Sequence, residues 1–334
     1  MATFASLGLA SLESHGLEAV SRLGGGAAAE VLLACRLGRP EELCVVKTVA
    51  LRGLDSRGRL RALQEVQALK KLRHPNVAVY LQSWWNGVGP NSGRLTTVTE
   101  YAEDGDLRAP LAVGRARDEA LEGPVVAGWL QQILQGLEHV HSHGIVHRNL
   151  KPANVFLKGR WRICLLSDFD VLMALDSTAT AAAFCGDPAY SAPELLWNQR
   201  CSPAADLWAA GVILHELLAL RLPFEAPSAV ELVRQVAFAP LELCGVGGSA
   251  LAATAAALLS KEPAQRPGAA ELLGDEALWL GLCPQGPCPA ACEAFARAQA
   301  ASMPRAEDNA WAAAGPLWDH LRRTREDCDL VSAP

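Results

Sequence analysis

The sequence predicts an α+β fold of two lobes, in which a small strand-rich lobe with one helix precedes a larger helical lobe. In the first hundred residues, short apolar runs bounded by glycine or charged residues are typical of buried strands, as at 31–33 and 44–46. Further along, apolar residues recur at helical spacing over 125–141 and 207–220. The chain has 334 residues, of which 50% are hydrophobic, so it can bury sizeable cores and is not intrinsically disordered.

The small lobe is predicted over 15–103. After its first strands, apolar residues at helical spacing predict its one helix over 60–72, and a Thr/Val-rich run predicts a strand over 95–100. The larger lobe is predicted over 104–281, where glycine and proline separate shorter helices. A Pro/Cys/Ala-rich stretch then begins a C-terminal tail over 282–334, in which an Ala-rich pattern carrying Trp311 and Trp318 predicts a helix.

Composition excludes several classes of function. The net charge of −6 gives no basic surplus for nucleic acid or for an anionic membrane surface. The longest apolar run, over 250–259, is too short to cross a bilayer, and the first residues lack the basic start of a secretory signal. Ten cysteines without a tight spacing pattern predict reduced thiols. We therefore expect a cytoplasmic protein with no nucleic-acid partner and no membrane insertion.

A glycine-rich turn lies between the first two predicted strands, from Leu23 through Gly24 and Gly26 to Val31. Because glycine has no side chain, the backbone N–H groups of Gly24 and Gly26 can approach phosphate oxygens closely. Glycine-rich hairpins are also common without any ligand, so the turn alone leaves both interpretations open.

The motifs that follow the turn occur in an informative order. Lys47 lies on an apolar strand, where an ammonium group needs a partner, and Glu65 comes later in the predicted helix. The alternative is a solvated lysine and an ordinary helix glutamate. Next come His-Arg-Asn-Leu-Lys-Pro-Ala-Asn at 147–154, Asp-Phe-Asp at 168–170 and Ala-Pro-Glu at 192–194, followed by Asp206 and Arg266. In this order the motifs resemble the signature set of the protein kinase family, over roughly 15–281.

The resemblance implies a two-lobed protein kinase fold that binds ATP and Mg²⁺. Gly24 and Gly26 would cover the phosphates, and Lys47 would pair with the phosphates and with Glu65. Asn154 and Asp168 would hold magnesium, for which oxygen ligands are suited. Other positions implied to meet the nucleotide are Leu23, Val31, Val45, Glu100, Ala102 and Phe156.

The resemblance also implies structural roles. Lys151 fits the serine/threonine-type pattern, and Glu194 with Arg266 would form an ion pair that holds the larger lobe together. Asp206 would anchor an internal stack of His147, Phe169, Leu69 and Tyr80. For the ion pair and for Asp206, we expect a role in the fold and none in the chemistry.

The chain departs from the family pattern at four informative positions. Asn149 stands where the family carries its catalytic aspartate, and an amide oxygen cannot take a proton from a substrate hydroxyl. Loss of a general base lowers the rate about 10²–10⁴-fold. Asp170 replaces a glycine, Asp187 replaces a threonine, and Val45 replaces a small alanine above the adenine. The residues implied to bind Mg-ATP, which are Lys47, Glu65, Asn154 and Asp168, are all present. We therefore expect nucleotide binding without efficient phosphoryl transfer.

Asp187 carries a more specific hypothesis. In the fold that the resemblance implies, it lies near Lys151 and Asn149, so charge predicts a Lys151–Asp187 pair with Asn149 donating to the same carboxylate. The alternative is that Asp187 is an ordinary loop acid that points to solvent.

The sequence is therefore interpreted as a catalytically impaired pseudokinase near the NIMA-related branch. It would bind nucleotide and act as a scaffold or allosteric partner of an unknown protein. One alternative is an active or weakly active serine/threonine kinase, with Asn149 orienting the substrate and another carboxylate as base. A second alternative is a structural module that binds no nucleotide, in which Val45 and Asp170 close the site.

Overall fold

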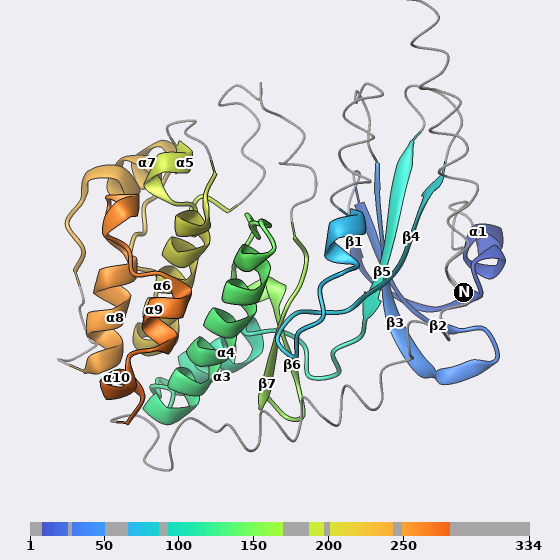
Figure 1. Cartoon of the computed structure of the whole chain (residues 1–334), viewed down its shortest axis with the longest axis horizontal. Helices are drawn as coiled ribbons and strands as arrows, with labels where there is room; N and C mark the ends of the chain where they lie inside the picture. The colour runs from blue at the N-terminus through green and yellow to red at the C-terminus, as the bar shows by residue number, and fades with distance from the viewer. Residues whose placement is uncertain are drawn as a thin grey trace, which may run out of the picture. The chain divides into compact units, whose positions relative to one another are not determined.

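The computed structural model of the chain (Figure 1) resolves into two compact units, and each is described by itself. The first lies within 9–72 and 79–101, and the second within 73–78 and 102–280. Gly26, Glu65, Asp170 and the predicted tail lie outside the described residues. The residues that the structure describes are 9–25, 29–50, 66–86, 93–169, 187–196, 201–242 and 249–280.

The first unit is built on an antiparallel sheet of five strands in the order β1-β2-β3-β5-β4. The predicted strands at 31–33, 44–46 and 95–100 are confirmed as parts of β2, β3 and β5. The described residues on both sides of the glycine-rich turn therefore belong to the same sheet as the lysine strand. The strands are β1 (Leu17–Gly25), β2 (Ala29–Arg36), β3 (Arg39–Ala50), β4 (Tyr80–Asn86) and β5 (Arg94–Glu100).

One face of this sheet is covered by a short helix that the sequence did not predict, α1 (Leu9–Ser14). Leu12 of α1 joins a buried cluster with Val46 of β3 and Trp84 of β4. Immediately after α1, the ring of His15 stacks on Trp84, with centroids 4.0 Å apart and planes tilted by 11°. Six residues are too few for a stable isolated helix, so α1 depends on this packing against the sheet.

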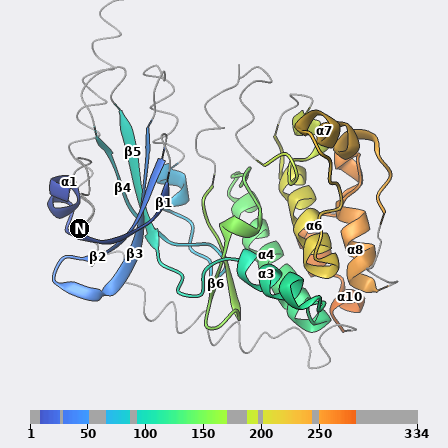
Figure 2. The same cartoon turned by 180° about the vertical axis from the view of Figure 1, so that it is seen from behind.

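The second unit is mainly helical. The predicted helices over 125–141 and 207–220 are confirmed as α4 and α6, and Figure 2 shows α6 between α4 and α8. Within the described part of the chain, no helix has the length and apolarity needed to cross a membrane. The longer helices are α3 (Arg108–Arg117), α4 (Gly123–Ser142), α6 (Pro203–Ala219), α7 (Ala229–Phe238) and α8 (Ala250–Leu258). Shorter elements are α5 (Pro193–Leu196), α9 (Ala269–Leu273), α10 (Glu276–Leu280), the 3₁₀ turns η1 (Pro152–Asn154) and η3 (Pro263–Gln265), and the hairpin of β6 (Val155–Lys158) with β7 (Ile163–Leu166).

Helix α6 is the centre of this unit. Trp208 of α6 is fully buried and packs with Phe224, Val236 of α7 and Leu259. At Gly211 the backbone approaches α8 so closely that a Cβ atom would lie 2.7 Å from the Cβ atom of Leu258. Glycine is therefore required at this crossing, because any side chain would push α6 and α8 apart.

A buried ion pair ties α5 to the segment after η3, as the sequence predicted. The two Nη atoms of Arg266 donate to the two Glu194 carboxylate oxygens over 2.6 and 2.7 Å. Arg266 also donates to the carbonyl oxygens of Ala204 and Ser260. Because the guanidinium is surrounded by acceptors, its burial is compensated, and the pair serves the fold.

Three histidine rings hold the 73–78 segment against the end of α4. His74 stacks on His139 with centroids 5.0 Å apart, and His139 lies 4.5 Å from His143. The Nδ1 atom of His74 accepts the backbone N–H of Asn76, which requires that nitrogen to be unprotonated. Burial, with a smaller contribution from His139, lowers the pKa of His74 to about 4, and burial and His143 lower the pKa of His139 against an opposing effect of Glu138.

Removing one member of the Glu194–Arg266 pair should be strongly destabilising. We expect Arg266→Met to lower the free energy of unfolding by about 3–5 kcal/mol, because Glu194 then stays buried without its partner. In the matched control Arg234→Met, which breaks the exposed pair with Glu231, the loss should be below about 1 kcal/mol. Denaturant unfolding measures both free energies of unfolding. Equal losses in the two variants would contradict a stabilising role of the Glu194–Arg266 pair.

Because of the histidine stack, the free energy of unfolding should decrease as the pH falls. Since the folded state holds His74 with a lowered pKa, the unfolded chain binds its proton first, so this contribution is complete above pH 6.5 and declines as the pH falls toward about 4. The variant His74→Asn keeps an acceptor for Asn76 but cannot titrate, and its melting temperature should fall less between pH 7 and pH 5. His15→Gln, in the first unit, should keep the full pH dependence. An unchanged pH slope in His74→Asn would overturn this prediction.

Candidate functional site

The loop over 147–154 takes its shape from one carboxylate. Asp206, on the first turn of α6, is 1% exposed and accepts the backbone N–H groups of His147 (2.8 Å) and Arg148 (2.9 Å). A third donor is His141 at the end of α4, whose Nε2 atom lies 2.8 Å from the same carboxylate. Arg148 has a φ of 64°, a left-handed conformation that only tertiary contacts of this kind maintain in a non-glycine residue.

Asn149 is held in this loop by its backbone. Its N–H donates to His147 Nδ1 at 3.3 Å, and its carbonyl oxygen accepts the Asn154 side-chain amide at 2.6 Å. The Asn149 side chain donates from Nδ2 to the backbone carbonyl of Asp168 at 3.4 Å. The residue thus contributes a neutral amide, with no group that can take up a proton.

The two residues predicted to hold magnesium lie on either side of the β6–β7 hairpin. The Nδ2 atom of Asn154 donates to the Asn149 carbonyl, a bond that does not use the Asn154 Oδ1 atom, and the Ser167 N–H donates to the Asn154 carbonyl. Asp168 follows β7 with a φ of 60°, a strained conformation that is typical of functional positions. An amide oxygen and a carboxylate are ligands that suit Mg²⁺, so these residues fit the ion.

Phe169 and His147 form part of the internal stack that the resemblance implied. Their rings stack with centroids 4.3 Å apart, and both residues are buried. Burial lowers the pKa of His147, so it is a neutral structural ring. The other two predicted members, Leu69 and Tyr80, are buried in the first unit.

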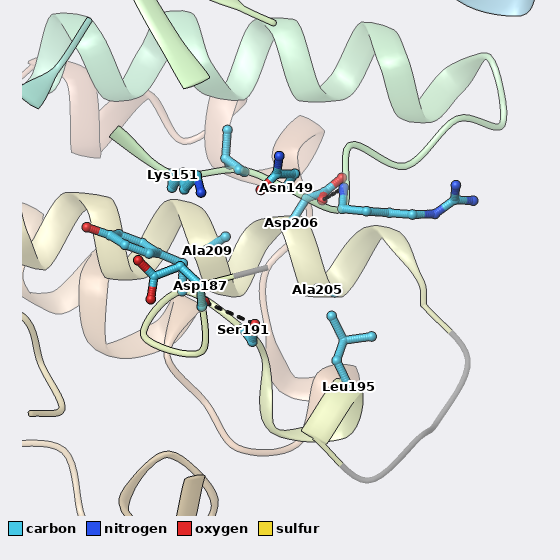
Figure 3. A pocket seen from close by; sticks show the side chains of 11 residues that line it. Asn149, Lys151, Asp187, Ser191, Leu195, Ala205, Asp206 and Ala209 are labelled. Atoms are coloured by element: carbon cyan, nitrogen blue, oxygen red, sulfur yellow. Dashed lines mark hydrogen bonds between the residues drawn. The ribbon is translucent and has the colours of Figure 1, made fainter. Parts of the chain in front are cut away.

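A pocket opens beside Asn149 (Figure 3). Asn149 and Lys151 lie on one wall, and Asp187 and Ser191 lie on the facing loop. The expected Lys151–Asp187 pair is not formed, since no ion pair within 4.0 Å joins these two described residues. Asp187 is exposed, and its carboxylate instead accepts the N–H of Ala189 at 3.1 Å. The solvent-facing alternative is therefore correct, because a local turn bond satisfies the carboxylate.

Sequence reasoning missed a polar network behind this pocket. The hydroxyl of Tyr190 donates to Glu216 over 2.6 Å, and Arg115 of α3 donates to the other Glu216 oxygen over 2.6 Å. Burial and the Glu216 charge raise the pKa of Tyr190, so it remains protonated. These hydrogen bonds hold the segment that follows Asp187 against α6 and α3. No local sequence motif predicts them.

In the first unit, the predicted nucleotide residues share one face of the sheet. Lys47 on β3 lies opposite Val31 on β2 and Thr97 on β5, and Val45 is two positions away on the same face. Gly24 and Leu23 lie at the end of β1, where the Leu23 side chain is 49% exposed. The sheet therefore brings together a cation, an apolar surface and the start of the glycine-rich turn.

The remaining residues predicted to meet the nucleotide lie at the end of β5 or later in the chain. Glu100 ends β5, and its carboxylate accepts the N–H of Val79 at 2.8 Å. In the second unit, Ala102 is buried with Leu165, and Phe156 of β6 packs against the same cluster. Glu100 is therefore held by a contact within the first unit, and Ala102 and Phe156 are held by contacts within the second unit.

Comparison with known proteins agrees with this geometry. The family model described as "Protein kinase domain" matches residues 17–278. The chain belongs to the protein kinase family. This confirms the predicted α+β protein kinase fold and the wider family resemblance.

Similar proteins include serine/threonine kinases of the Nek group. Human "Serine/threonine-protein kinase Nek5" is 32% identical over 202 residues, which is 59% of this chain and 28% of that protein. Mouse "Serine/threonine-protein kinase Nek4" is 33% identical over 231 residues, 69% of this chain and 28% of that protein. "Putative serine/threonine-protein kinase A" of Trypanosoma brucei brucei is 32% identical over 206 residues, 60% and 46% respectively. The chain thus spans less than half the length of these relatives.

Proposed function

We propose that this chain is a pseudokinase that binds Mg-ATP and acts as a cytoplasmic scaffold or allosteric partner of another protein. The observation that carries the proposal is Asn149, a neutral amide where the family carries its catalytic aspartate, held in its loop by hydrogen bonds to His147, Asn154 and Asp168. Its His-Arg-Asn motif also resembles that of serine/threonine kinase-like domain-containing protein 1. The free thiols of Cys35, Cys44 and Cys164 support a reducing compartment.

The proposal of nucleotide binding rests on the kinase-domain match, which assigns this role to residues of each unit taken separately. Lys47 supplies a cation for the phosphates, and Glu65 is proposed as its partner. Asn154 and Asp168 would hold Mg²⁺, which neutralises phosphate charge when bound. Glu100 and Ala102 flank the segment proposed to meet the adenine. Val45 narrows this surface by two methyl groups relative to alanine, which weakens binding without removing a charged contact.

Phosphoryl transfer lacks a proton acceptor at Asn149. The amide oxygen of Asn149 can accept a hydrogen bond from a substrate hydroxyl and orient it, but the proton has no base there to receive it. Phosphoryl transfer depends mainly on positioning and electrostatics, so slow residual transfer is compatible with this site.

One observation favours the alternative of a weakly active serine/threonine kinase. The exposed carboxylate of Asp187 lines the same pocket as Asn149 and Lys151, where it could serve as a substitute base. The proposed function and this alternative differ in what substitution of Asp187 does to the transfer rate.

Mg-ATP should raise the melting temperature of the chain. At 100 times its Kd, a ligand stabilises a protein by about 2.7 kcal/mol, which a thermal melt detects. Lys47→Met should abolish most of the shift, because it removes the phosphate cation. Lys71→Met, at an exposed lysine, is the matched control and should keep the shift. Equal stabilisation of both variants, or no shift in the unmodified chain, would favour the module that binds no nucleotide.

Asn149→Asp should raise the transfer rate to a generic Ser/Thr peptide, by up to about 10²-fold, since it restores a base. Because Lys151 and Asp187 form no ion pair, the double change Asn149→Asp, Asp187→Thr should restore no more activity than Asn149→Asp alone. Initial rates with radiolabelled ATP measure this. If Asp187→Thr alone removes a transfer activity present in the unmodified chain, Asp187 is the base and the pseudokinase assignment is wrong.

A further inference from the structure

The turn between β6 and β7 has an unusual backbone. Gly159, Arg160 and Trp161 are three successive residues in the left-handed conformation, with φ angles of 60°, 52° and 72°. Glycine adopts this conformation freely, whereas arginine and tryptophan adopt it only where surrounding contacts hold them there. The turn is therefore a strained structure that other parts of the chain maintain.

Two acidic side chains supply one set of these contacts. The Asp104 carboxylate accepts the backbone N–H groups of Arg160 and Trp161, the second over 3.3 Å. The neighbouring Glu103 carboxylate accepts the N–H of Gly159 over 3.1 Å. Successive N–H groups of a turn form a concave site for an anion, and here two carboxylates of the chain itself occupy it. Hydrogen bonds from N–H groups to a carboxylate are among the stronger ones in proteins.

The hairpin that carries this turn is fixed to α4. The Trp129 indole donates to the Trp161 carbonyl over 2.7 Å, and the Gln132 side chain donates to the Arg162 carbonyl over 2.9 Å. Figure 1 shows the β6–β7 hairpin beside α4. Because the hairpin is held by a long helix, it offers a firm support for the segment that contains the two acidic residues.

That segment also lies along β6 through its backbone. The Asp104 N–H donates to the Leu157 carbonyl over 3.1 Å, and the Leu157 N–H donates to the Gly105 carbonyl over 2.8 Å. An antiparallel bridge then pairs Asp106 with Phe156. Asp104 is therefore bonded to the hairpin through both its backbone and its side chain, which fixes the register of the 102–107 segment on β6.

Two residues proposed to meet the nucleotide lie next to this contact. Ala102, two positions before Asp104, is buried with Leu165, and Phe156 of β6 packs against the same cluster. The position of Ala102 relative to Phe156 depends on the register of the segment on β6. A shift of the segment would therefore change the surface that these two residues offer to a ligand.

We infer that Asp104, assisted by Glu103, is a positioning residue of the nucleotide site, because it holds the segment that begins at Ala102 in register with β6. The inference rests on the proposed binding of Mg-ATP. It concerns the adenine end of the nucleotide. The residues proposed to bind the phosphates and the metal lie outside this segment and outside the hairpin turn, and they are Lys47, Asn154 and Asp168.

Isothermal titration calorimetry of the full chain with adenosine and with Mg-ATP tests the inference. Asp104→Ala should raise the Kd of both ligands by the same factor, on the order of tenfold, because the apparent Kd rises as the fraction of chains in the binding-competent arrangement falls. Asp104→Asn keeps an acceptor oxygen for the two N–H groups, so its Kd values should lie closer to those of the unmodified chain. Glu103→Ala removes one hydrogen bond instead of two and should raise both Kd values by a smaller factor.

The matched control is Asp275→Ala, since Asp275 also accepts a backbone N–H in the same unit, that of Leu278 over 3.1 Å. Both Kd values should stay unchanged in this variant, even where its melting temperature falls. If the unmodified chain binds neither ligand, the proposed function is wrong and the inference falls with it. If the unmodified chain binds both ligands and Asp104→Ala binds them equally well, the inference alone is overturned. Equal losses of affinity in Asp104→Ala and Asp275→Ala would also overturn it, because they would indicate a general effect of destabilisation.

Discussion

The carboxylate of Asp206 is the constraint on which the described part of the site depends. A buried carboxylate is stable only when donors replace its lost water, and here two backbone N–H groups and one imidazole do so. Those donors come from His147, Arg148 and His141, so Asp206 joins α6 to α4 and to the 147–154 loop. Without it, the Arg148 N–H would lose its acceptor, and the left-handed backbone that leads into Asn149 would lose one of the contacts that maintain it.

This arrangement explains why a kinase fold tolerates asparagine at position 149. The loop uses the backbone N–H and carbonyl of Asn149, whereas the side chain makes a single longer contact to Asp168. The geometry of the loop therefore does not depend on a carboxylate at this position. The described contacts of this loop are therefore compatible with the proposed loss of a base at position 149, and they leave the proposed metal ligands in place.

How much the sequence could predict depended on how local each feature is. The strands of β2, β3 and β5 and helix α4 were predictable because their apolar periodicity is contained within a few turns or a few residues. The order of the motifs selected Lys47, Asn154 and Asp168 as candidate site residues, since each lies beside its own recognisable neighbours in the sequence. Glu194 and Arg266 were paired through the family resemblance, although they lie 72 residues apart.

Features set by tertiary contact could not be predicted in the same way. Helix α1 is too short to show a period and exists because Trp84 and its neighbours offer an apolar face. The Tyr190–Glu216–Arg115 network joins residues 26 and 101 positions apart that no motif connects. The Lys151–Asp187 prediction was wrong because it considered charge alone. A backbone N–H two residues away satisfies Asp187 with less loss of side-chain freedom than a distant lysine would require.

The central proposal is that this protein binds Mg-ATP yet transfers phosphate very slowly. Phosphorus NMR of Mg-ATP with an equimolar amount of the full chain and a Ser/Thr peptide tests binding and transfer together. The account predicts that the γ-phosphate resonance shifts or broadens on addition of the chain and keeps its intensity for hours. Unperturbed resonances would contradict nucleotide binding. Conversion to ADP and phosphopeptide at about one turnover per second, the range of ordinary kinases, would contradict the assignment as a pseudokinase.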